Sequence, residues 1–205
     1  MIVGIDFDGT IVSCRDKQIA CLRDGVGALR SNINWSAVWR RKRNGLNNPS
    51  ALSTYKFNES EISQINDYWR RNIESRAYAR YDKLLPNVRS VLESIRINNK
   101  IFLISARKNS HILHWQLKEL SLLQHFSDVV VVEPARASEA KAQAFVRLGL
   151  DCYVGDTETD FAASLAAGIP GYIVSTGQRS EGFLKRSGVR NIFGGISAIQ
   201  KVLNA

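Results

Sequence analysis

The sequence predicts an α/β protein: a doubly wound, parallel sheet of five strands with an inserted segment made only of helices. A short apolar run opens the chain and ends at acidic residues. After Pro86, apolar runs of strand length alternate with helical patterns, which is typical of a parallel sheet covered by helices. Residues 14–84 show helical periodicity without a strand signal. We therefore expect a core domain of residues 1–13 and 85–205 and a helical domain of residues 14–84.

The N-terminal apolar run predicts a buried strand that delivers acids to its carboxyl end. Asp6 ends the run, Asp8 follows two places later, and Gly9 indicates a turn. Side chains alternate along a strand, so Asp6 and Asp8 would share a face if the strand continued. Crowded carboxylates need a cation or a proton, and Mg²⁺ is the hard cation that prefers oxygen ligands.

The segment 14–84 is expected to form a bundle of helices. Apolar residues at spacings of three and four predict a helix over 19–33, which two glycines interrupt with a kink or a break. A further helix is expected from Trp35 into the basic run Arg40–Arg43. A third is expected over about 59–82, where Asn58 begins a capping box.

From Pro86 onwards, strands and helices are expected to alternate. The expected strands cover 100–105, 129–132, 152–154 and 171–174. The expected helices begin at about 86, 109, 138, 159, 180 and 196. Right-handed crossovers place the carboxyl ends of all parallel strands at one edge of the sheet. Asp6, Ser105 and Asp156 each follow a predicted strand, so we expect these side chains to lie close together.

Four motifs in this order resemble those of the haloacid dehalogenase (HAD) superfamily. Asp6–Thr10 (DFDGT) is similar to the first motif, and Ser105 at a strand end is similar to the second. Lys141 near a helix start is similar to the third motif, with Arg136 as the alternative cation. Gly155–Asp160 (GDTETD) is similar to the fourth. The resemblance implies a Rossmann-like core with an inserted helical C1 cap over 14–84, as in phosphoglycolate-phosphatase-like members.

The resemblance also implies roles for individual residues. Asp6 would be the nucleophile that forms an aspartyl-phosphate, and Asp8 would be the general acid–base. Mg²⁺ would be bound by Asp6, by the backbone carbonyl of Asp8 and by Asp156. Asp160 would support the metal through water or a further hydrogen bond. The presence of Asp8 favours phosphoryl transfer over dehalogenation.

A second group of residues is expected to hold the phosphate or the substrate. The Ser105 hydroxyl would donate to a phosphoryl oxygen, together with backbone N–H groups such as that of Ala106. Lys141 would supply positive charge for the nucleophile and the phosphate. The remaining candidates for this group are Thr10, Arg107 and Asn109. Thr10 is expected to orient its loop, and a surface ion pair is an equal alternative for Arg107.

Composition indicates a soluble globular protein. Hydrophobic residues make up 44% and charged residues 23% of 205 residues. No apolar run approaches the roughly 20 residues of a membrane span. The chain starts directly with the predicted strand, so no signal peptide is expected and the predicted location is cytoplasmic. The three cysteines form no CxxC pair and indicate neither a metal site nor a disulfide.

Positive charge is concentrated in the helical segment. Residues 14–84 hold fourteen Lys/Arg and seven Asp/Glu, whereas the whole chain has a formal net charge of +9. Trp35, Trp39 and the run Arg40–Arg43 mix rings with cations, which could stack on bases or clamp phosphates. The simpler interpretation is that the tryptophans are core residues and the arginines face solvent.

Three functions are compatible with these observations. The favoured one is a Mg²⁺-dependent phosphatase acting on a small phosphorylated metabolite. A phosphomutase or phosphotransferase would use the same chemistry with an alcohol in place of water. The third is a nucleic-acid- or protein-binding module that uses the basic helical surface.

Overall fold

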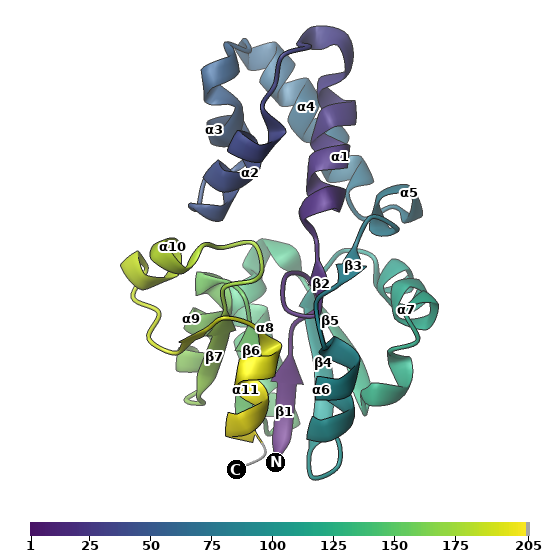
Figure 1. Cartoon of the computed structure of the whole chain (residues 1–205), viewed down its shortest axis with the longest axis vertical. Helices are drawn as coiled ribbons and strands as arrows, with labels where there is room; N and C mark the ends of the chain where they lie inside the picture. Colours follow the sequence, from purple (N-terminus) through teal and green to yellow (C-terminus); the bar gives the residue numbers. More distant parts are fainter. Residues whose placement is uncertain (204–205) are drawn as a thin grey trace.

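A parallel sheet of six strands, flanked by helices, forms the lower part of the molecule in the view of Figure 1. The computed structural model describes residues 1–203. The strand order is β5-β4-β1-β6-β7-β8, and every neighbouring pair is parallel. The strands are β1 (Ile2–Ile5), β4 (Lys100–Ala106), β5 (Asp128–Val132), β6 (Cys152–Gly155), β7 (Gly171–Val174) and β8 (Ile192–Phe193).

The doubly wound parallel sheet confirms the predicted fold class, and the sheet is one strand wider than predicted. The five expected strands are present close to their expected positions. The sixth, β8, pairs with β7 through only two residues, Ile192 and Phe193. A strand of that length is too short to leave a recognisable alternation of apolar and polar residues.

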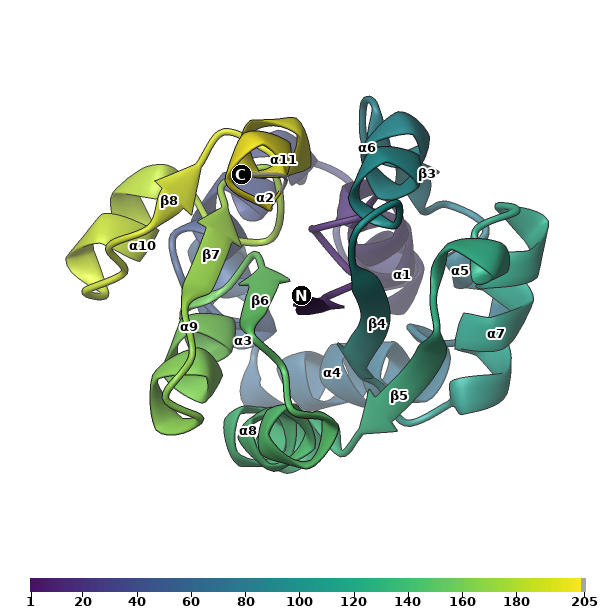
Figure 2. The same ribbon diagram turned by 90° about the horizontal axis from the view of Figure 1, so that it is seen from below.

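Helices cover both faces of the sheet (Figure 2). The helices α6 (Val88–Ile95), α7 (Ser110–Glu119) and α11 (Ile196–Leu203) share one apolar cluster with β1 and β4. On the other face, α8 (Ala137–Leu148) and α9 (Glu158–Ala166) form a second cluster with β4 and β6. A short helix, α10 (Glu181–Arg186), packs beside the β8 edge. The centre of the sheet is therefore sealed from water on both sides.

A group of five helices lies beyond the carboxyl ends of the strands (Figure 1). These are α1 (Arg15–Val26), α2 (Trp35–Arg43), α3 (Asn48–Leu52), α4 (Glu59–Asn72) and α5 (Arg76–Ala79). The chain leaves the sheet through β2 (Val12–Ser13) and returns through β3 (Lys83–Leu84), which pair antiparallel. This pair lies at the expected boundary of the helical segment. The division of the chain into two domains there stays a prediction.

The break expected within 19–33 is present, because the helix ends at Val26 and Gly27 takes a positive φ of 51° that breaks the helical path. Two other expectations for the helical segment were wrong. The helix predicted over 59–82 ends at Asn72 and is followed by the separate helix α5. Lys83 and Leu84 form β3 in a stretch where no strand was expected. A two-residue strand at the end of a helical segment leaves no periodic signal.

The helical segment has its own apolar core. It consists of Ile19, Leu22, Val26, Val38, Ala51, Leu52 and Ile65. Trp35 and Trp39 pack against this core, as the simpler interpretation of these rings expected. The basic run behind them is not a uniformly solvated face. Arg41 donates to the carbonyl of Ala51, and Arg43 donates to the carbonyls of Ser175 and Arg179 in the sheet part of the molecule.

None of the helices within residues 1–203 combines the length and the apolar character needed to cross a bilayer.

The buried centre of the sheet is expected to dominate stability. Leu103 on β4 is fully buried, whereas Ile97 is 76% exposed. Leu103→Ala should reduce the free energy of unfolding by about 2–5 kcal/mol, because it removes apolar contacts and leaves a cavity. Ile97→Ala should change it by less than about 0.5 kcal/mol. Urea denaturation of both variants measures this, and equal effects would contradict the assignment of the core.

Candidate active site

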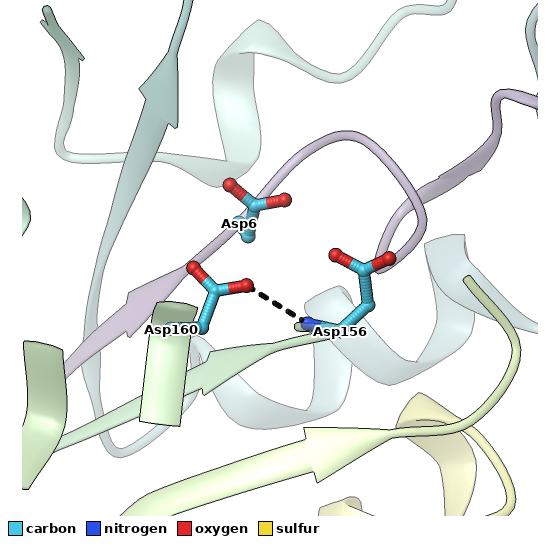
Figure 3. A group of neighbouring side chains, drawn as sticks. All are labelled: Asp6, Asp156 and Asp160. Carbon is cyan, nitrogen blue, oxygen red and sulfur yellow. Dashed lines mark hydrogen bonds between the residues drawn. The ribbon is translucent and has the colours of Figure 1, made fainter. Parts of the chain in front are cut away.

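Three aspartates converge at the carboxyl edge of the sheet (Figure 3). Asp6 follows β1, Asp156 follows the neighbouring strand β6, and Asp160 lies in the first turn of α9. One carboxylate oxygen from each lies within 4.8 Å of the other two, and all three residues are buried. The adjacent ends of β1 and β6 thus bring together residues that are about 150 positions apart in the sequence.

Asp160 is held by the turn that begins α9. Thr157 is the N-cap, and its hydroxyl accepts from the Asp160 backbone N–H. The Asp160 carboxylate accepts in return from the Thr157 hydroxyl at 2.7 Å and from the backbone N–H groups of Thr157 and Asp156. Although burial opposes it, the Lys141 ammonium, together with the Thr157 hydroxyl and the Asp156 backbone N–H, keeps the Asp160 pKa below its usual range. Asp160 is therefore a fixed anion.

Lys141 on α8 joins two of the aspartates. Its Nζ lies 2.7 Å from an Asp6 oxygen and 2.5 Å from an Asp160 oxygen. Burial disfavours the ammonium, but the Asp160 and Asp6 carboxylates raise the Lys141 pKa well above its usual value. Arg136, the alternative cation, is exposed and pairs with Glu139. Of the two cations considered, Lys141 is the one at the cluster.

Asp156 lacks a comparable cation. Its carboxylate accepts from the Gln178 backbone N–H at 2.5 Å. Gly9, with φ of 87°, passes so close that a Cβ there would lie 2.1 Å from an Asp156 oxygen. Burial, followed by the charges of Asp160 and Asp6, raises the Asp156 pKa well above its usual value. Burial also raises the pKa of Asp6 to about 7. Asp156 is thus the least compensated acid of the cluster.

The cluster as a whole has an excess of negative charge. Within the described residues, the only ammonium or guanidinium paired with Asp6, Asp156 or Asp160 belongs to Lys141. If all three acids ionise, one positive charge faces three negative ones. A divalent cation would cancel this excess, and carboxylate oxygens are the ligands that Mg²⁺ prefers. The donor set therefore fits a divalent metal.

Asp8 belongs to a different cluster. Arg107 binds its carboxylate with two hydrogen bonds of 2.7 and 2.8 Å, and Lys17 donates to it at 2.7 Å. Lys17 also donates to Asp82 at 2.7 Å, while Gln116 donates to the same Asp82 oxygen. Although burial opposes it, Arg107 and Lys17 hold the Asp8 pKa well below its usual range. Two acids thus face two cations, so the Asp8 carboxylate is balanced without a metal.

A cavity of about 240 Å³ opens above both clusters. The helical segment contributes Lys17, Gln18, Trp69, Ile73 and Glu74 to its lining. From the sheet side, the lining includes the three aspartates, Asp8, Ser105, Ala106, Arg107 and Lys141. Of the ten site residues predicted from the sequence, eight therefore line this one cavity, and Thr10 and Asn109 do not.

Three of the phosphate- or substrate-binding candidates have structural contacts or buried positions in this arrangement, and their binding roles stay predictions. Arg107 pairs with Asp8, so its charge is already matched before any phosphate binds. Asn109 is the N-cap of α7, and its side chain accepts from the Ile112 backbone N–H. Thr10 is fully buried, and its hydroxyl has no hydrogen-bond partner among residues 1–203. Neither Asn109 nor Thr10 lines the cavity of about 240 Å³.

Lys17 and Gln178 were not among the residues predicted for the site. Lys17 lies on α1 in a segment whose periodicity shows only which side is apolar. Gln178 acts through its backbone N–H, which any residue other than proline would supply. Its position just after β7, at the carboxyl edge of the sheet, could have placed Gln178 among the predicted site residues.

Comparisons with known proteins agree with this fold. The family model described as haloacid dehalogenase-like hydrolase matches residues 5–174. A solved structure titled as a predicted phosphatase from Clostridium acetobutylicum is 18% identical, with a TM-score of 0.73 over 98% of this chain and 97% of that one. A haloacid dehalogenase-like family protein from Streptococcus pneumoniae is 17% identical, with a TM-score of 0.75 over the same shares.

A third solved structure, titled as a predicted phosphoglycolate phosphatase from Haemophilus somnus, is 19% identical. Its TM-score is 0.67 over 98% of this chain and 96% of that one. At such identities these structures show that the fold is shared over almost the whole length. No curated protein matches the chain.

The metal-free protein should lose stability between about pH 4 and pH 7. Unfolded Asp6 ionises near 3.8, whereas folded Asp6 has a pKa of about 7. The folded state therefore binds more protons in this window, and a rising pH favours unfolding. Asp8 and Asp160 have lowered pKa values, so their stabilising effect is lost only as pH falls below about 4.

Urea denaturation in the presence of a chelator measures this effect at several pH values. The contribution of Asp6 is the difference between the wild type and Asp6→Asn, since other titrating groups are common to both. The wild type should lose more stability than the variant as pH rises through this window. Parallel pH profiles would contradict the raised pKa of Asp6.

Proposed function

Because the chain belongs to the haloacid dehalogenase-like hydrolase family, we propose that it is a Mg²⁺-dependent phosphatase for a small phosphomonoester. The observation that supports this best is the buried cluster of Asp6, Asp156 and Asp160 with its single lysine, at the floor of a cavity. Two of the similar structures described above, from Clostridium acetobutylicum and Haemophilus somnus, are named as predicted phosphatases, which agrees with this reaction class.

The metal would be held by Asp6 and Asp156, with the backbone carbonyl of Asp8 as the further protein ligand expected from the family motif. Asp160, which is tied to Lys141 and Thr157, would support the site without moving. Bound Mg²⁺ would neutralise the repulsion between the phosphate and the attacking carboxylate. Because the metal-free cluster is short of positive charge, binding would also lower the pKa values of Asp6 and Asp156.

Asp6 would be the nucleophile. Lys141 fixes one of its oxygens at 2.7 Å, which orients the carboxylate toward the cavity. An Asp6 oxygen would form a bond to phosphorus while the bond from phosphorus to the leaving oxygen breaks, giving an aspartyl-phosphate and an alcohol. The Ser105 hydroxyl and the Ala106 backbone N–H, both at the cavity, would donate to phosphoryl oxygens.

Asp8 would act as the general acid–base. It would give a proton to the leaving oxygen and then take a proton from the water that attacks the aspartyl-phosphate. Arg107 and Lys17 keep it ionised in the present arrangement. To donate a proton, Asp8 must therefore lose part of this pairing. Lys17 belongs to α1 in the helical segment, so a displacement of α1 would remove one of the two cations.

The substrate is proposed to be a small phosphorylated metabolite, and the helical segment would select its leaving group. Residues of α1 and α4 line the cavity opposite the aspartates, so they lie where the alcohol part would extend. A cytoplasmic location remains part of this proposal.

Asp6→Asn should abolish phosphate release from p-nitrophenyl phosphate in the presence of Mg²⁺, because an amide is not a nucleophile for this transfer. A loss of at least about 10⁴-fold in kcat is expected. The matched control is Asp67→Asn, an exposed change on α4 outside the cavity lining, which should keep wild-type activity. A chelator should remove the activity, and Mg²⁺ should restore it. Retained turnover in Asp6→Asn would contradict the mechanism.

A further inference from the structure

A second cavity of about 380 Å³ adjoins the one that holds the aspartates. The two cavities share three wall residues, Gln18, Trp69 and Gln178. The rest of the second cavity is formed by the end of α2, the 45–49 stretch, α4 and Arg179. A molecule with its phosphate at Asp6 would therefore enter the second cavity by passing Trp69.

The lining of the second cavity is positively charged. It includes Lys42, Arg70 and Arg179 and contains no aspartate or glutamate. The charge of Arg179 is matched, because its guanidinium binds both carboxylate oxygens of Glu158 at 2.7 and 3.0 Å. Arg70 is exposed on α4. The remaining unmatched cation inside the cavity wall is Lys42.

Lys42 differs from the two lysines of the first cavity. Lys17 and Lys141 each bridge two carboxylates. Across residues 1–203, by contrast, no carboxylate lies within 4.0 Å of Lys42 Nζ. Its ammonium donates to the side-chain carbonyl of Asn48 and lies 5.5 Å from the centre of the Trp69 ring. Desolvation lowers the Lys42 pKa to about 8. A desolvated ammonium that has no carboxylate partner gains free energy when an anion binds beside it.

We propose that the second cavity receives the far end of the substrate, and that this end carries a second anionic group bound by Lys42. This inference rests on the phosphatase function proposed above. The substrate class is then an elongated phosphomonoester with a carboxylate or a second phosphate at the end opposite the reacting phosphate. Trp69 lines both cavities, so the chain that connects the reacting phosphate to the second anionic group must contain more than one carbon. Trp39 and Trp69 provide apolar walls for that chain.

A series of synthetic substrates tests the charge and the length together. One arm consists of straight-chain phosphomonoesters with two to eight carbons that end in a carboxylate. The second arm ends in a second phosphate, and the third ends in the neutral methyl ester of the same acid. The quantity compared is kcat/KM of each anionic compound relative to the neutral compound of the same length.

The anionic compounds should be preferred by about ten- to a hundredfold at an intermediate length, which is typical of one charge-assisted hydrogen bond. The better of the two anionic arms identifies the group that Lys42 binds. Equal kcat/KM values for anionic and neutral compounds at every length would overturn the inference and leave the phosphatase function intact. Absence of phosphate release from all three arms and from p-nitrophenyl phosphate would instead overturn the phosphatase function.

Two variants connect the preference to one side chain. Lys42→Met keeps most of the side-chain volume and removes the charge, so the preference for the anionic end should fall to about one. Arg40→Met removes a charge from an exposed position on the same helix, outside the cavity lining, and should keep the wild-type preference. An unchanged preference in Lys42→Met would overturn the assignment of Lys42. If Lys42→Met does not fold, as judged by thermal denaturation, the wild-type series decides the proposal.

Discussion

The site depends on one ammonium group that has to compensate more acids than it can match. Lys141 is shared by Asp6 and Asp160, and Asp156 lies beside them with a backbone N–H as its main donor. Burying an ionised carboxylate without a partner costs several kcal/mol, so the metal-free cluster keeps protons that an exposed cluster would release. The inference that this cluster fits a divalent cation follows from this shortage of positive charge.

The neighbouring cluster around Asp8 differs from it in having balanced charge. Asp8 and Asp82 face Lys17 and Arg107, so equal numbers of acids and cations meet in this cluster. That cluster has no need of a metal, and its residues come from both the sheet and the helical segment. The same 240 Å³ cavity thus contains a charge-deficient half and a balanced half. In the proposed mechanism, the deficient half binds metal and phosphate, and the balanced half controls when Asp8 can exchange a proton.

The sequence alone was sufficient to bring Asp6 and Asp156 together, because the carboxyl ends of parallel strands meet at one edge. Lys141 was identified as a lysine near a predicted helix start, between the second and fourth motifs, and the structure places it on that cluster. The partners of Asp8 were not predictable in the same way. Arg107 lies two residues after Ser105 and was expected either at the phosphate or in an ion pair. That its partner is Asp8 depends on packing between α7 and the helical segment. The position of Lys17 at the site was not predictable for the same reason, because the apolar periodicity of α1 does not show which residues lie across the cavity.

The most direct test of this account is the anomalous diffraction of a crystal soaked in Mn²⁺, which binds the same oxygen ligands as Mg²⁺. The account predicts one strong peak in contact with carboxylate oxygens of Asp6 and Asp156, with Lys141 still bound to Asp160. A peak centred on Asp8 and Asp82, or no peak at the aspartate cluster at millimolar Mn²⁺, would contradict it.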